Sequence, residues 1–155
     1  MTIKQQIQED FITAMKSRDE LSKSALTGLK SQILLAEKAE GKSELTQSDL
    51  IEVVSKSIRQ REESHKIYLS AGREDLATKE LMESQILRKY LPAQMSDNQI
   101  REALSQIWKE LSTQITNPKA LEGKTIGQFN KTFTGRADIE NVKEILSEMK
   151  NELTT

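Results

Sequence analysis

Few side chains in this sequence could serve as catalytic groups. The chain has one histidine, His65, and no cysteine among its 155 residues. The lack of cysteine excludes disulfides, iron–sulfur clusters, thiolate zinc sites and cysteine nucleophiles, and a single histidine excludes a poly-histidine metal site. No serine has the flanking glycines of a nucleophile elbow, and only His65 could activate one. Neighbouring acids such as Glu62-Glu63 and Glu74-Asp75 are typical of solvated helix faces. We therefore predict no catalytic residue, no metal site and no cofactor.

Gly123-Lys124-Thr125 is the one segment that resembles a phosphate-binding loop. Such a loop needs a glycine where Pro118 stands and a strand before it, and the sequence supplies neither. Gly123 and Gly127 also form a GxxxG pattern, but in a polar context that excludes its membrane meaning. We interpret these glycines as places where helices approach closely in a small core.

The distribution of charge is more informative than its total. Lysine and arginine number 23 against 24 acids, so the whole chain has no excess positive charge to attract nucleic acid or anionic lipid. Residues 113–137 nevertheless have a net charge of plus three, and residues 138–155 have minus three. The basic side chains of the first segment are Lys119, Lys124, Lys131 and Arg136. They could contact a phosphate backbone. Alternatively, they pair with the acidic last helix while Phe129 and Phe133 enter the core.

The spacing of apolar residues predicts seven helices and no strand. Four of them precede Pro92: one after a possible Thr2 N-cap, one from Asp19 to near Glu40, one from Thr46 to about Ser70, and one from Arg73 to about Leu91. The other three begin at the capping box Ser96–Gln99, at Asn117-Pro118 with an end at Gly135, and at Asp138.

The fold class that follows is all-α, with an N-terminal helical bundle of about four helices and a small C-terminal three-helix domain. Pro92-Ala93-Gln94-Met95 is the best boundary, so we expect domains 1–92 and 96–155. The chain opens without a signal-peptide pattern and has no run of 18 apolar residues. We expect a cytoplasmic protein without a membrane partner, and the residues predict no particular oligomeric state.

Polar side chains continue the apolar face of the third predicted helix, at Arg61, His65 and Tyr68. They could form a site. The alternative is that Arg61 packs along its stem and pairs with a carboxylate, with His65 at the margin of the core.

A longer set of spaced residues resembles the signature of the YqeY-like family. It comprises Gln60, Arg61, Ser64, Tyr68, Ala71, Gly72, Arg73, Asp75, Leu76, Ala77, Glu80, Glu83, Ile86, Leu87, Tyr90, Leu91, Pro92 and Gln94. Matches at Ala14-Met15-Lys16-Ser17-Arg18-Asp19 and at Gly135-Arg136-Ala137-Asp138 extend the resemblance over essentially the whole chain.

This resemblance implies an all-α protein with a link to tRNA. Relatives form the tail domain of the B subunit of the glutamine-dependent Asp-tRNA/Glu-tRNA amidotransferase, where the tail contacts tRNA and other domains carry the chemistry. The family label, carbon–nitrogen ligase with glutamine as amide donor, therefore does not describe an activity of this chain alone.

We accordingly expect a non-catalytic module that binds the body of tRNA through Lys124, Lys131 and Arg136, with Lys119 peripheral. One alternative is an accessory role in the transamidation or translation machinery, and another is a protein-interaction scaffold without nucleic-acid contact. We expect the remaining signature residues to be structural: Gln60, Arg61, Tyr68, Gly72, Arg73, Asp75, Tyr90 and Pro92. Specifically, Arg61 or Arg73 should pair with Asp75 or Glu80 across the turn at Gly72.

Overall fold

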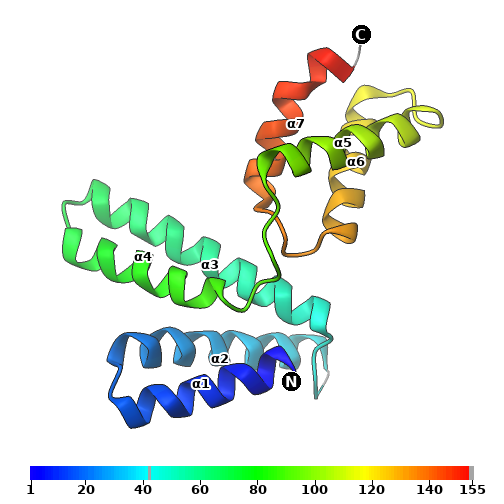
Figure 1. The fold of residues 1–155 in the computed structure, drawn as a ribbon. Helices are drawn as coiled ribbons and strands as arrows, with labels where there is room; N and C mark the ends of the chain where they lie inside the picture. Colours follow the sequence, from blue (N-terminus) through cyan, green and yellow to red (C-terminus); the bar gives the residue numbers. More distant parts are fainter. Residues whose placement is uncertain (42, 154–155) are drawn as a thin grey trace. The chain divides into compact units, whose positions relative to one another are not determined.

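The computed structural model describes residues 1–41 and 43–153, and those residues form seven helices and no strand (Figure 1). The helices are α1 (Ile3–Ser17), α2 (Glu20–Glu40), α3 (Gln47–Ser70), α4 (Glu74–Arg88), α5 (Asp97–Ser112), α6 (Pro118–Thr132) and α7 (Ile139–Leu153). The predicted all-α class is confirmed.

Side-chain caps fix where several of these helices begin. The N-cap side chains of α1, α3 and α5 each accept a hydrogen bond from the N–H of the third helical residue, and the side chain of that residue accepts one from the N-cap N–H. These N-caps are Thr2, Thr46 and Ser96. Asn117 accepts bonds from Lys119 and from Ala120, and Pro118 occupies the first turn of α6, where no N–H is needed.

Glycines in the left-handed region mark two helix ends. Gly41 has a φ of 65° after α2, and Gly72 has a φ of 73° after α3. Such backbone angles favour glycine because its lack of a Cβ removes the steric penalty. The sixth helix ends at Thr132, earlier than the expected Gly135, because Phe133 leaves helical geometry at φ −117° and ψ 41°.

The chain divides into two compact units, Met1–Leu91 and Pro92–Thr155. The core of the N-terminal unit consists of Ile7, Ala25, Leu26, Leu29, Ile33, Leu45, Leu50, Val54, Ile58, Leu87 and Tyr90. The core of the C-terminal unit consists of Ile100, Leu104, Ile107, Trp108, Leu121, Phe129, Val142, Ile145, Leu146 and Met149. The amphipathic spacing of each helix supplies one face to its core.

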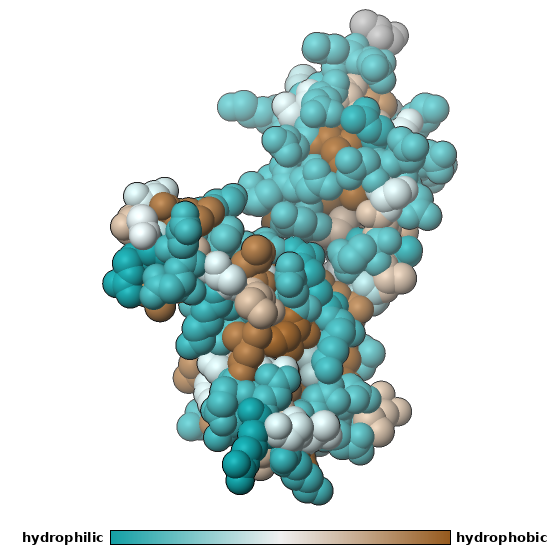
Figure 2. Space-filling view, turned by 60° about the vertical axis from the view of Figure 1, so that its left-hand side comes forward, coloured by the Kyte–Doolittle hydropathy of each residue, from teal (hydrophilic) through white to brown (hydrophobic). Residues whose placement is uncertain are grey.

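The surfaces of the two units differ in character. Among the described residues, every large apolar side chain that is exposed lies in the N-terminal unit: Met1, Ile12, Met15, Leu34, Leu35, Ile67, Leu69, Leu81 and Met82. Figure 2 shows apolar atoms gathered between hydrophilic ones on one face of that unit. No helix of the described chain is both long enough and apolar enough to cross a bilayer.

Candidate functional site

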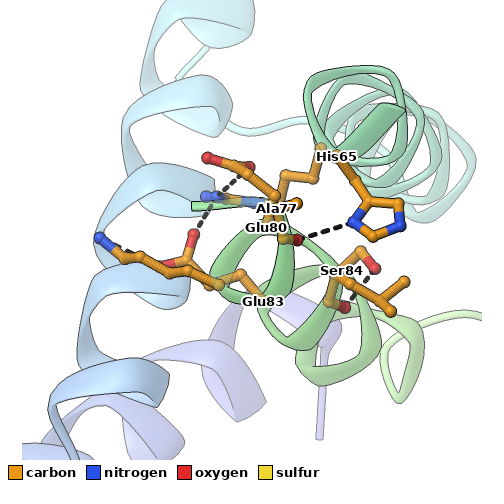
Figure 3. A network of polar contacts seen from close by, with 8 residues as sticks. His65, Ala77, Glu80, Glu83 and Ser84 are labelled. Atoms are coloured by element: carbon orange, nitrogen blue, oxygen red, sulfur yellow. Dashed lines mark hydrogen bonds and ion pairs between the residues drawn. The ribbon is translucent and has the colours of Figure 1, made fainter. Parts of the chain in front are cut away.

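A cluster of charged side chains lies where α2, α3 and α4 meet (Figure 3). Arg61 of α3 forms an ion pair with Glu83 of α4 and approaches Glu80 to 3.6 Å. Its guanidinium passes over Gly28 of α2, where a Cβ would lie 2.6 Å from Nη2. Because Gly28 has no side chain, Arg61 has room to reach both carboxylates.

Glu83 is the most enclosed charge of this cluster. Its side chain is 3% exposed, and its Oε1 atom has no hydrogen-bond donor among the described residues. Lys79 contributes a second cation at 3.9 Å from Oε1. Because a buried carboxylate needs a nearby cation, the Arg61–Glu83 pair links α3 to α4.

His65 extends the same cluster along α3. Its Nδ1 lies 2.7 Å from the carbonyl oxygen of Ala77, and a carbonyl only accepts, so Nδ1 carries the proton and donates. Ser84, nearby on α4, donates its hydroxyl to the Leu81 carbonyl at 2.6 Å. The His65 bond joins α3 to α4, whereas the Ser84 bond lies within α4. Since both groups are bound to backbone oxygens, they form no nucleophile–base pair.

The expected pairing across the turn at Gly72 is confirmed for Arg61 and Glu80, and Arg61 has a nearer partner in Glu83. Arg73 contacts Asp75 at 3.3 Å, but both residues follow Gly72, so this pair does not cross the turn. The hydrogen bond from Arg73 lowers the pKa of Asp75, although both side chains are largely exposed. The sequence reasoning did not assign Glu83 as the main partner of Arg61; its position three residues after Glu80 on α4 is the signal that points to it.

Tyr90 has a partner that lies far away in the sequence. Its hydroxyl donates to Asp10 of α1 at 2.6 Å, and Lys89 lies 3.0 Å from the same carboxylate. Burial raises the pKa of Asp10, but the hydrogen bonds from Tyr90, Lys89 and Gln6 outweigh it, so the net shift is downward. Burial and the bond to Asp10 raise the pKa of Tyr90. This contact fastens the turn after α4 to α1.

The remaining signature residues surround these contacts. Gly72 takes the left-handed conformation, and the N–H of Arg73 bonds the Tyr68 carbonyl at 2.9 Å, which closes α3. Gln60 is exposed, and Pro92 accepts a hydrogen bond from Gln94 at its carbonyl. Within the described residues, no group of three or more carboxylates and imidazoles could hold a metal ion.

The basic residues predicted to contact phosphate lie on and after α6. Lys119, Lys124 and Lys131 are exposed, and none of them forms an ion pair with another described residue. Lys124 and Lys131 are seven residues apart, so they project from the same side of the helix. The structure thus places these two lysines together and leaves Lys119 at the start of α6.

Arg136 is engaged within its own unit. Its Nε donates to the Ala93 carbonyl at 3.1 Å, and its guanidinium lies 5.8 Å from the centre of the Phe133 ring. The N–H of Met95 donates to the Arg136 carbonyl at 2.8 Å, and Gln94 donates to Gly135 at 2.8 Å. Arg136 therefore joins segment 92–95 to the turn before α7.

Two interpretations of the α6 region need correction. Gly123 and Gly127 are exposed, and no atom lies within 4 Å of a Cβ added to either one, so they do not serve close packing inside the core. The alternative in which the α6 lysines pair with the acidic last helix is also wrong. The ion pair between these helices instead joins Lys150 of α7 to Glu122 of α6, at 2.6 Å. Phe129 is buried and Phe133 packs beside it, as the core alternative expects.

The sequence model of a family described as "Yqey-like protein" matches residues 4–149, from the first turn of α1 into α7. The chain belongs to the YqeY-like family. The match covers both units of the YqeY-like chain, so the charged cluster at Arg61 and the exposed face of α6 both lie within the family domain.

Several curated relatives are fungal proteins. A Saccharomyces cerevisiae protein named "Altered inheritance of mitochondria protein 41, mitochondrial" is 30% identical over 80% of this chain and 81% of its own length. A Candida glabrata protein of the same name is 34% identical over 55% of this chain and 47% of its own length. An uncharacterised Schizosaccharomyces pombe protein is 34% identical over 59% of this chain and 73% of its own length.

These names correct one expectation. The predicted cytoplasmic location is wrong as an inference, because the relatives that match most of the chain are named as mitochondrial. Composition and the absence of a long apolar run do not distinguish the cytoplasm from the interior of an organelle.

Proposed function

We propose that this YqeY-like chain binds RNA, specifically the body of tRNA, through one face of α6. We define the α6 basic face as Gly123, Lys124, Gly127 and Lys131, with Lys119 at its edge. The observation that carries the proposal is a pair of exposed helical glycines beside lysines that form no ion pair with a described residue.

Gly123 and Gly127 lower the stability of α6, and no contact within the described chain requires a glycine at either position. A glycine inside a helix is less favourable than alanine by about 1 kcal/mol, so two of them cost about 2 kcal/mol. Nothing lies within 4 Å of a Cβ at either position, and neither has a positive φ. The fold itself gains nothing from them. A helix surface without side chains does, however, allow a phosphate backbone to approach between the flanking lysines.

The number of lysines sets the expected strength of binding. Three phosphate contacts give a slope of log affinity against log salt of about −2 to −3. Affinity should then fall about 20- to 40-fold between 50 and 200 mM salt. Such binding is weak and directed, and it is compatible with a chain whose net charge is −1.

The test is a tRNA mobility-shift titration at several salt concentrations. We expect Lys124→Gln/Lys131→Gln to weaken binding about tenfold and to reduce the salt slope by about two units. The exposed Lys109 and Lys143 belong to the same unit but to other helices, so Lys109→Gln/Lys143→Gln is the matched control. Equal binding by the two double variants would refute the assignment, and no binding by the wild type would refute the function.

A second variant separates close approach from charge alone. Gly123→Ala/Gly127→Ala should stabilise the C-terminal unit by about 1–2 kcal/mol because alanine is the better helix former. It should also weaken tRNA binding, since the new methyl groups stand where the phosphate backbone approaches. A stabilised variant that binds as tightly as the wild type would show that the glycines do not contact RNA.

A further inference from the structure

An apolar groove runs between α1 and α2 of the N-terminal unit, with a volume of about 820 Å³. Its floor consists of buried or partly buried apolar side chains: Ile7, Phe11, Ile33, Leu45 and Leu50. Leu34 stands in its wall and is 51% exposed, so it adds apolar surface that solvent and a ligand can reach. The groove is separate from the α6 basic face, so it is a second candidate site.

The length of the groove corresponds to a short helix. Its lining extends along α1 from Thr2 to Phe11 and along α2 from Thr27 to Glu37. With a rise of 1.5 Å per residue, these stretches measure about 13–15 Å, which equals between two and three helical turns. Partner helices that bind in grooves place apolar anchors at i, i+3 or i+4, and i+7, and such a stripe has this length.

The two ends of the groove differ in charge. At one end, Lys30 lies over the Phe11 ring at 4.2 Å and forms no ion pair with a described residue. At the other end, Lys4 pairs with Glu37 at 2.6 Å, and Glu44 adds a carboxylate that forms no ion pair with a described residue. Among the described residues that line the groove, one end is therefore net positive and the other net negative. The two ends lie about 10 Å apart, because Lys4 and Phe11 are seven residues apart on α1.

We propose that this groove binds an amphipathic helix of a partner protein. The partner helix carries a stripe of apolar side chains, an acidic residue at the end over Lys30 and a basic residue at the end over Glu44. A long-chain fatty acid fits less well, because its apolar tail would have to end among the charges of Lys4, Glu37 and Glu44. Charge at both ends and apolar surface between them match a helix with charged termini.

The probe is a stapled amphipathic peptide of about 14 residues, long enough to span the groove. Leucines form one stripe, glutamates occupy its first turn and lysines its last turn. A control peptide of the same composition distributes the leucines around the helix. Binding is measured by fluorescence anisotropy, and contacts are located by amide chemical shifts of the intact protein. We expect saturable binding with a dissociation constant of about 1–100 μM.

Two leucines on α2 provide a matched pair of variants. Leu34 lines the groove, whereas Leu35 is 60% exposed and does not line it. We expect Leu34→Ser to weaken peptide binding about tenfold, because it removes buried apolar contact, and Leu35→Ser to change it less than about twofold. Both side chains are exposed in the free protein, so both variants should fold.

A charge exchange tests the orientation. Lys30→Glu should weaken binding of the original peptide, and replacing the peptide's glutamates with lysines should restore it. Equal effects of Leu34→Ser and Leu35→Ser, no saturable binding up to about 1 mM, or tighter binding of palmitate at the same residues would each overturn the proposal. Loss of tRNA binding would leave these results unaffected, because the α6 basic face lies in the other unit.

Discussion

The ion pair between Arg61 and Glu83 gives the sharpest prediction about how α3 and α4 are held together. The change is Arg61→Met, which keeps an apolar stem of similar length and removes the guanidinium. Glu83 is 3% exposed, so its carboxylate would stay buried with only Lys79, at 3.9 Å, as a cation. The variant thus tests the cost of leaving one member of a buried pair without its partner.

The expected magnitude follows from this geometry. Removing one partner of a buried ion pair costs about 3–5 kcal/mol. Lys79 is 54% exposed and recovers at most about 1 kcal/mol, so we expect a loss of about 3 kcal/mol. With a urea slope of about 2 kcal/mol/M, the midpoint of the N-terminal unit should fall by about 1.5 M.

The assay can observe the two units separately. The only tryptophan, Trp108, lies in the core of the C-terminal unit, so its fluorescence follows that unit. Circular dichroism at the helical band follows both units. We expect the first signal to stay at the wild-type midpoint while the second acquires an earlier transition.

Two further variants decide whether the reasoning holds. Arg88→Met removes an exposed pair with Glu62 that joins the same two helices, and it should cost less than about 1 kcal/mol. Arg61→Met/Glu83→Leu removes the buried charge itself and should regain most of the lost stability. If Arg61→Met costs no more than Arg88→Met, or if the double variant is as unstable as the single one, the buried pair does not hold the helices.

Three more outcomes follow from the same contacts. Gly28→Ala should destabilise the N-terminal unit although alanine is the better helix former, because the new Cβ would lie 2.6 Å from Arg61. Urea unfolding measures the change, and a higher midpoint for the variant would show that Arg61 simply moves aside. Tyr90→Phe should cost about 1.5–3 kcal/mol at pH 7. Because the pKa of Asp10 is lowered from 3.8, the stability that Asp10 contributes is present above that pH and is lost as pH falls below it. Tyr90→Phe removes part of this contribution, so the stability of the variant should fall less steeply with acid than that of the wild type. Gln94→Ala removes bonds to two carbonyls and should cost the C-terminal unit about 1 kcal/mol, seen by tryptophan fluorescence, without affecting the N-terminal unit.

Local signals account for the parts of the fold that the sequence predicted well. Thr46 with Asp49, and Ser96 with Gln99, are caps that act within four residues, and both form. Gly41 closes α2 at the expected position for the same reason. The end of α6 was less predictable, because Phe133 leaves the helix while it packs against Phe129, which is a tertiary contact.

Contacts between distant segments required the three-dimensional structure. Asp10 and Tyr90 are 80 residues apart, and neither residue type specifies the other as its partner. Arg136 looked like a phosphate-binding residue in the charge pattern, but its guanidinium bonds Ala93 at a separation of 43 residues. Charge counts treat all basic residues alike, whereas folding decides which of them remain available.

By itself the sequence determined the all-α class, the start of most helices, the family and the lack of cysteine chemistry, because these depend on residue types and short-range spacing. The tertiary structure decided that Arg61 pairs with Glu83, that Gly123 and Gly127 face solvent, and that an apolar groove lies between α1 and α2. Each of these depends on which helix faces pack together, and packing leaves exposed only what no neighbouring helix covers.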